Sequence, residues 1–252
     1  MRLDVHEGGH HSGNWGGLLT NPGVVMAHAI ASMVDRNGKI LVEGWRSTEM
    51  PDSVRAAIAK LDVGGGENAP TMNPNWGEPD MTPAERVFAS NTFEIRAFET
   101  GNPGSPANAI PPSAVVFGHL RYVVGTDPDQ LMPMLRAHLD KHGFNAIDII
   151  GDRSPMYATR LDPNHPWAKW VVASLAKTHG EEIAVIPNLG GSLPNDVFAD
   201  DLGLPTIWVP HSYAGCSQHA PNEHILEGTT RSALRLMTGL WWDLGVGETP
   251  DG

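Results

Sequence analysis

Cysteine, positive charge and long apolar runs are all scarce in this sequence, and each scarcity excludes a class of protein. With Cys216 as its single cysteine, the chain cannot form an internal disulfide and is typical of a reducing compartment. The 17 lysines and arginines are outnumbered by 29 aspartates and glutamates, which argues against nucleic acid or an anionic membrane as a partner. No apolar run approaches the ~20 residues of a membrane helix, and no signal region opens the chain. We therefore expect a cytoplasmic protein with neither kind of partner.

The first 153 residues combine alternating apolar patterns with helical ones, in a chain long enough for two domains. We expect strands at 2–6, 39–45, 92–99, 114–124 and 144–150 and helices at 22–34, 51–61, 83–89 and 127–143. This order of elements predicts an α+β domain over residues 1–153, an antiparallel sheet with helices on one face.

Residues 154–252 follow a different pattern. Expected helices at 166–179, 193–202 and 223–244 alternate with short apolar strands at 183–186 and 206–209. Such alternation predicts a buried parallel sheet. Because sheets typically have ~4–6 strands, two strands predict an incomplete α/β subdomain.

The stretch DVHEGGHHSGNWGG at 4–17 contains H-E-G-G-H from His6 to His10, the pattern of a zinc-protease helix. Two histidines four positions apart reach one metal in that way only when the backbone between them makes a helical turn. The two glycines between them each cost about 1 kcal/mol in a helix interior relative to alanine. The preceding residues alternate as in a strand. We therefore expect a strand that runs into a glycine-rich loop.

Three further segments carry candidate chemistry. ANAIPPSA at 107–114 precedes a strand bearing Arg121, which either holds a carboxylate in a cleft or is a solvated sheet residue. NLGGSLPND at 188–196 is a glycine turn before a helix, where Ser192 either caps the helix or helps to bind an anion. CSQHAPNEH at 216–224 puts His219 in a loop, as a metal ligand or as a capping or packing residue.

Taken in order, HHSGNWGG, NAIPPSA…LR, GGSLP and HAPNE resemble motifs of the di-zinc exopeptidase and amidohydrolase family. That family includes carnosinase-like dipeptidases, glutamate carboxypeptidases, acetylornithine deacetylases and succinyl-diaminopimelate desuccinylases. Its patterns run H-S-G-x-x-G-G, N-x-I-P, G-G-S-I-P and H-x-x-N-E. Each is weak alone, but the four in order span most of the chain. The order of elements also agrees with the family's lid, or dimerisation, domain followed by the closing part of its catalytic domain.

The resemblance implies a role for each matching residue. His11 matches the lid histidine that reaches into the partner subunit's active site and stabilises the oxyanion of the tetrahedral intermediate. Asn108 and Arg121 match lid residues that orient the substrate and hold its carboxylate. Gly191 and Ser192 match the groups that receive the free end of the substrate.

For metal binding, the resemblance implies that His219 is the C-terminal ligand of a centre holding two zinc ions, with manganese or cobalt as alternatives. Glu223 in the same motif is taken as structural. The family's other ligands and its general base precede the lid, whereas here Met1 falls within the first lid strand. One imidazole cannot hold two zinc ions, because each catalytic zinc needs about three protein ligands. We therefore expect that this chain alone does not bind zinc stably, and that another polypeptide supplies the N-terminal catalytic half.

The sequence thus predicts metal-dependent hydrolysis of a peptide or N-acyl amide bond in a small carboxylate-bearing substrate, with homo-oligomerisation through the lid. One alternative is a non-catalytic dimerisation module. A second is a metal-independent hydrolase or esterase that uses Ser192 or Cys216 as nucleophile and His211, His219 or His11 as base. No G-x-S-x-G motif supports that second alternative.

Overall fold

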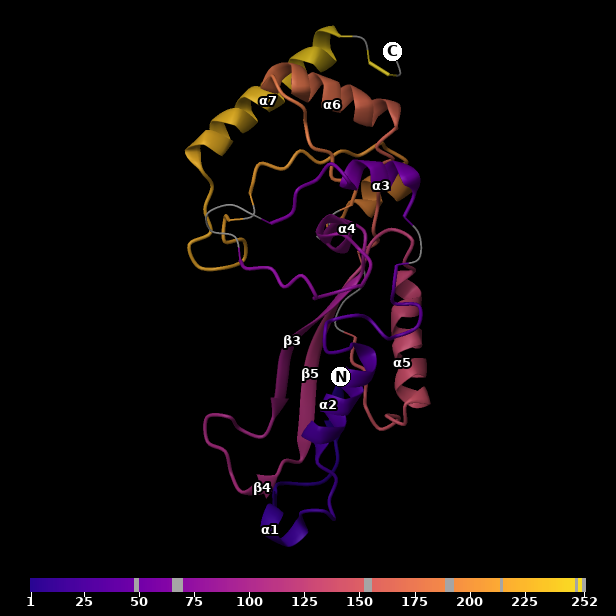
Figure 1. Cartoon of the computed structure of the whole chain (residues 1–252), viewed down its shortest axis with the longest axis vertical. Coiled ribbons are helices and arrows are strands. Elements are labelled where there is room, and N and C mark those ends of the chain that lie inside the picture. Colours follow the sequence, from indigo (N-terminus) through magenta and orange to yellow (C-terminus); the bar gives the residue numbers. More distant parts are fainter. Residues whose placement is uncertain are drawn as a thin grey trace. The chain divides into compact units, whose positions relative to one another are not determined.

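The computed structural model describes residues 1–47, 50–64, 70–151, 156–188, 193–213, 215–247 and 249–250. The chain divides into two compact units, whose elements are labelled in Figure 1. The first unit comprises residues 1–49, 75–81 and 89–157, and the second comprises 50–74, 82–88 and 158–252. No helix in the described part of the chain is long and apolar enough to cross a membrane.

Two segments that precede the predicted boundary at residue 153 group with the second unit. They contain α3 (Asp52–Ile58) and α4 (Pro83–Phe88), which contact each other. Ser53 Oγ in α3 donates a hydrogen bond to Asp162 at 3.2 Å, and Lys60 forms an ion pair with Glu182. These long-range contacts explain the grouping. The division into 1–153 and 154–252 itself stays a prediction.

A three-stranded antiparallel sheet forms the centre of the first unit. Its strands lie in the order β1 (Arg2–Asp4), β5 (Ser113–Arg121), β3 (Thr92–Thr100). The pairing of β3 with β5 runs from Thr92 opposite Arg121 to Thr100 opposite Ala114. Because side chains alternate between faces, β5 presents Ala114 and Val116 to one side and Phe117 to the other.

Helices α2 (Pro22–Met33) and α5 (Leu131–Lys141) pack against one face of this sheet (Figure 1). α2 begins where predicted, because Pro22 is its first residue and the Asn21 side chain accepts a hydrogen bond from the Val24 N–H. The core consists of Leu3, Met26, Ala29, Met33, Ile40, Val42, Trp45, Ala114, Val116, Leu135, Leu139 and Ile147. Phe117, on the other face, is 62% exposed. The predicted α+β fold is confirmed.

Two strands predicted for the first unit are wrong. Within the described residues, 39–45 and 144–150 form isolated bridges only, Val34 with Ile40 and Arg2 with Asp148. Both segments still contribute core side chains, among them Val42 and Ile147. The apolar pattern of these two segments therefore indicates that their side chains are buried, and it does not indicate strand pairing.

The second unit is built on two long helices, α6 (Pro166–His179) and α7 (Glu227–Val246). α6 has the predicted bounds, since Pro166 begins it and Gly180, at a φ of 91°, ends it in the left-handed conformation. α7 begins four residues later than predicted. The helices pack through Val171, Leu175 and Leu240.

No strand forms in the described residues of the second unit, so the strands predicted at 183–186 and 206–209 are wrong. Ile183, Ile207 and Val209 pack against the α6–α7 cluster, but their backbones have no ladder partner in the part of the chain that the structure describes. A β-strand exists only beside a neighbour that completes its hydrogen bonds. The helix predicted at 193–202 is also reduced, to the π-helical turn η2 (Val197–Asp201).

Candidate functional site

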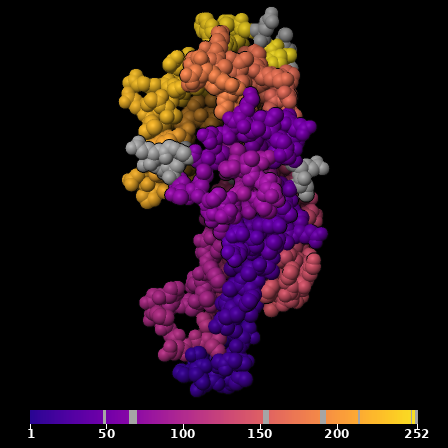
Figure 2. Space-filling view, viewed as in Figure 1, coloured from indigo at the N-terminus to yellow at the C-terminus, as the bar shows by residue number. Residues whose placement is uncertain are grey.

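A small two-stranded sheet at one end of the first unit brings together two of the predicted site residues. β2 (His10–His11) pairs with β4 (Ala109–Ile110), so that His11 lies opposite Ala109, the neighbour of Asn108. The short helix α1 (Ser12–Trp15) follows at once, and the Ser12 N–H donates to the Asn108 carbonyl at 3.2 Å. Figure 2 shows this end at the surface, with indigo N-terminal atoms beside magenta atoms of the β4 segment.

The imidazole of His11 is held in one orientation by its own turn. Its Nδ1 accepts a hydrogen bond from the Gly13 N–H at 3.1 Å, which caps α1. A nitrogen that accepts carries no proton, so the neutral ring has its proton on Nε2. The side chain is exposed, and this Nε2–H is a donor directed by the cap.

A glycine at position 13 is required by the His11 ring. A Cβ at that position would lie 2.7 Å from Cε1 of His11 and 3.0 Å from its Nδ1. Any other residue would therefore push the imidazole out of its cap.

Arg121 is not brought to the same place as His11 and Asn108. It is the last residue of β5, whereas β4 precedes the first residue of that strand. Eight steps of ~3.3 Å separate Ser113 from Arg121, about 26 Å along the strand. The resemblance groups these three residues in one site, but His11 and Asn108 lie near the first residue of β5 and Arg121 is its last residue.

Two residues that the sequence analysis did not select lie near Arg121. Burial lowers the pKa of His119, and the guanidinium groups of Arg121 and Arg96 lower that pKa further. His119 and Arg121 are two positions apart in β5, so their side chains lie on the same face of the sheet. The sequence signal for this cluster of basic side chains is the pattern H-x-R in β5 together with Arg96 in the neighbouring strand β3.

His219 belongs to the second unit, in a turn with unusual backbone conformations. Ser217, His219 and Asn222 all have positive φ angles, of 58°, 61° and 65°. The His219 N–H donates to Oε2 of Glu223 at 3.2 Å, which ties the two ends of the turn. Non-glycine residues in this conformation store strain, and such residues cluster at functional sites. The His219 side chain is exposed.

The remaining predicted residues divide into two groups. Gly191 and Ser192 lie outside the described residues. Cys216 is only 5% exposed, and its Sγ accepts a hydrogen bond from Ser212 Oγ at 3.2 Å. Burial of this kind is typical of a structural cysteine and not of a nucleophile.

The H-E-G-G-H pattern is not on a helix. The residues from His6 to Gly8 form a bend, and Gly8 has a φ of 64°. The prediction of a glycine-rich loop is confirmed, and a zinc-protease helix is excluded.

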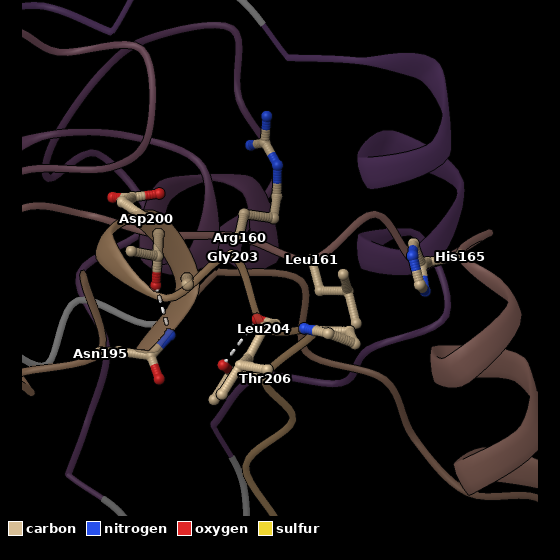
Figure 3. Close-up of a pocket in the computed structure, with 11 residues that line it drawn as sticks. Arg160, Leu161, His165, Asn195, Asp200, Gly203, Leu204 and Thr206 are labelled. Atoms are coloured by element: carbon tan, nitrogen blue, oxygen red, sulfur yellow. Dashed lines mark hydrogen bonds between the residues drawn. The ribbon is translucent and has the colours of Figure 1, made fainter. Parts of the chain in front are cut away.

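A polar pocket of about 230 Å³ in the second unit was not predicted (Figure 3). Burial lowers the pKa of Arg160, whose Nη1 donates to Asn188 Oδ1 at 3.3 Å. Asn195 donates to Thr159 Oγ1 at 2.5 Å and accepts from Trp208 Nε1 at 3.0 Å. The sequence carried no motif for this pocket, because its lining comes from separate segments at 159–165 and 195–206.

The described residues do not by themselves fit a di-zinc centre. They include no group of three or more His, Cys, Asp or Glu side chains able to hold a metal ion. His219 offers one imidazole, whereas each catalytic zinc takes about three protein ligands.

Comparison with known proteins places these features in a family. Residues 1–146 match the M20 peptidase dimerisation domain. The chain is 24% identical over 200 residues to the cysteinylglycine-S-conjugate dipeptidase of Corynebacterium striatum, a match that covers 77% of this chain and 42% of that protein.

Solved structures give the same result. The M20 family metallo-carboxypeptidase Sso-CP2 from Sulfolobus solfataricus matches with a TM-score of 0.75 and 26% identity, over 95% of this chain and 56% of that one. The dipeptidase Dug1p from Saccharomyces cerevisiae matches with a TM-score of 0.70 and 17% identity, over 95% and 52%. The chain thus spans about half the length of the relatives it matches. Because more than half of its residues match the family's domain, the chain belongs to the M20 peptidase dimerisation-domain family.

Proposed function

We propose that this chain is the lid and C-terminal part of a metal-dependent hydrolase. Its substrate would be a small peptide or N-acyl amino acid with a free carboxylate, cleaved at the amide bond. The observation that carries this proposal is the capped, exposed His11 beside Asn108, in a domain that matches the M20 dimerisation domain. The dipeptidase and carboxypeptidase activities named for the relatives support this substrate class.

In this proposal His11 donates its Nε2–H to the oxygen that becomes negative when the amide carbonyl is attacked. A preorganised donor of this kind is effective because it needs no rearrangement during the reaction. The Gly13 N–H provides that preorganisation by fixing Nδ1. Asn108 would orient the substrate from the adjacent strand.

The position of Arg121 supports a site shared between two copies of the chain. A dipeptide extends over about 7 Å, at up to ~3.6 Å per residue. One dipeptide therefore cannot reach both ends of β5, which lie about 26 Å apart. If Arg121 holds the substrate carboxylate as proposed, His11 and Arg121 of one copy serve different substrate molecules.

The metal ligands and the general base would come mainly from polypeptide outside these 252 residues, a second chain or the rest of a longer one. His219 would contribute the C-terminal ligand, and Gly191 and Ser192 would receive the substrate's free end. When bound, zinc, or manganese or cobalt in its place, would activate the attacking water. We further propose that the protein acts in the cytoplasm.

The test is to assay metal content and hydrolysis of a dipeptide and N-acyl amino acid panel, with zinc, manganese or cobalt added. The purified chain is compared with the same chain mixed with a polypeptide that supplies the family's remaining metal ligands and general base. We expect turnover only in the mixture, and a loss of about 10²–10³ in kcat for His11→Ala in that mixture. Two metal ions and chelator-sensitive turnover in the chain alone would contradict the proposal.

A non-catalytic dimerisation module is the second candidate, and the edge strand β3 favours it. β3 has nine residues and, among the described residues, pairs only with β5, so its other side is available for another strand. Sedimentation of the wild-type chain and of Phe98→Pro, which removes an N–H that β3 does not use in pairing with β5, tests pairing through this edge. A dimer that stays inactive in every mixture would favour the module over the enzyme. The alternative with Cys216 as nucleophile has no support from its buried position.

A further inference from the structure

The loop that precedes His11 brings two other histidine rings together. Gly8, at a φ of 64°, lies in the loop between β1, which pairs with β5, and β2, which pairs with β4. The rings of His6 and His10 lie with their centroids 4.8 Å apart and their planes at 70°. The proposed function uses neither of these histidines.

The ring nitrogens of His6 are in unequal positions. Nδ1 lies 2.9 Å from the carbonyl oxygen of Gly8, and since a carbonyl only accepts, Nδ1 carries the ring proton. Nε2 then holds a lone pair, yet it is buried and has no hydrogen-bond partner among the described residues. A histidine that donates one N–H to a backbone carbonyl and presents its other nitrogen as a lone pair has the arrangement of a metal ligand.

The separation of the two rings also fits coordination of one ion. With each nitrogen ~2.0–2.1 Å from the metal, ring centroids lie about 4.5 Å apart for a square-planar angle and about 5.2 Å apart for a tetrahedral one. The observed 4.8 Å falls between these values.

A second histidine pair in the same unit shows the contrast. His138 and His142 have centroids 4.4 Å apart, but Nε2 of His138 is 3.0 Å from the carbonyl oxygen of Ser32 and thus donates to it. That nitrogen cannot also bind a metal.

We infer that His6 and His10 form a binding site for a divalent transition-metal ion. Two imidazoles and water are ligands that suit Cu²⁺, Ni²⁺ and Zn²⁺, with Cu²⁺ bound most tightly, whereas Ca²⁺ and Mg²⁺ prefer oxygen ligands. His11 is not a third ligand through Nδ1, because that atom accepts from Gly13. An ion held by His10 would instead fix β2, the strand on which His11 lies. This inference does not depend on the proposed function.

Trp15 offers a local probe of the site, because its ring centroid is 6.2 Å from that of His10. CuCl₂ and ZnCl₂ are titrated into the purified chain, with binding followed by calorimetry and, for Cu²⁺, by quenching of tryptophan fluorescence. The quenching that Trp15→Phe removes is the signal from this site.

We expect one Cu²⁺ per chain at this site, bound more tightly than Zn²⁺. His6→Gln and His10→Gln each remove one of the two ligands and should weaken binding about tenfold or more, at least as much as the loss of a group that only orients a ligand. His28→Gln, on the exposed side of α2, and His142→Gln are matched controls and should bind as the wild-type chain does. Unchanged circular dichroism shows that each variant is folded. Equal affinities in the wild-type, His6→Gln and His10→Gln chains would overturn the inference, as would equal weakening in the controls.

Discussion

The Gly13 N–H donates to Nδ1 of His11 at 3.1 Å, and no side chain larger than hydrogen fits at position 13 without moving that ring. A residue two positions away thus sets the orientation and the tautomer of the histidine proposed to act at the oxyanion.

Gly13→Ala should therefore displace the His11 imidazole while leaving the fold intact. The added Cβ would meet Cε1 of His11 at 2.7 Å, so the cap should open and the Nδ1 lone pair should face solvent. The ¹⁵N chemical shifts of the His11 ring in the purified chain should change toward those of a free tautomer mixture. In the mixture of this chain with the polypeptide that supplies the remaining ligands, kcat should fall about as much as for His11→Ala, by a factor of about 10²–10³. Gly104→Ala, in an exposed turn of the same unit, is the control and should alter neither measurement.

Leu139→Ala should destabilise the first unit strongly. Leu139 is fully buried in the core where α5 packs, and truncating such a leucine costs about 2–5 kcal/mol of unfolding free energy. Phe117→Ala removes more atoms but from the exposed face of β5, so it should cost less than about 1 kcal/mol. Urea unfolding followed by circular dichroism compares the two. A larger cost for Phe117→Ala would mean that the outer face of the sheet is covered in solution.

The stability of the first unit should fall as the pH drops below about 6.5, the pKa of an unfolded histidine. Burial lowers the pKa of His138, and the neighbouring His142 and Lys141 lower it further, while the hydrogen bond to Ser32 raises it in part. Below pH 6.5 the unfolded chain then binds more protons at this residue than the folded one, so protonation favours unfolding. Above that pH the effect is absent.

Thermal unfolding at pH 7.5 and 5.5 checks this dependence. The Tm of the wild-type chain should drop between the two values, and His138→Gln should drop less. His28→Gln keeps the buried histidine and should follow the wild type. An equal drop in His138→Gln would assign the pH dependence to other groups.

Self-association should depend on one face of α7. Four large side chains of this helix are more than 60% exposed, namely Leu234, Trp241, Trp242 and Val246. Such exposed apolar surface drives association in water. Sedimentation should show concentration-dependent oligomers beyond a dimer, and the double variant Trp241→Arg, Trp242→Arg should shift the distribution to smaller species. If the double variant sediments as the wild type does, this face is not the contact.

Elements with local boundary signals could be predicted from the sequence, and elements that depend on a partner could not. Pro166 and Gly180 mark both ends of α6, and the alternation in 92–99 marks β3, so both were confirmed. Residues 183–186 and 206–209 have equally apolar sequences, but a strand also needs a neighbouring strand. Apolar character predicted their burial against α6 and α7 and could not predict pairing.

The site followed the same rule. The loop at 6–9 was predicted because the two glycines act locally, whereas the closeness of Ser12 to Asn108, 96 positions later, depends on the register of β2 and β4. The sequence of either segment alone does not indicate which residue of β2 lies opposite which residue of β4. The pocket around Arg160 was missed for the same reason, since its residues meet only in the folded unit.

The length of β5 sets the distance between Arg121 and the end of the first unit where His11 lies. Each residue added to or removed from the strand changes this separation by ~3.3 Å and also reverses the face to which every later side chain points. Removing one residue would turn Arg121 toward the face covered by α2 and α5, whereas removing two would keep its face and shorten the span by ~6.6 Å. A change of one residue would therefore have to be absorbed by a bulge, like the irregularity between Ile95 and Ala97 in β3, whereas a change of two would alter only the separation that the two ends present to whatever they contact.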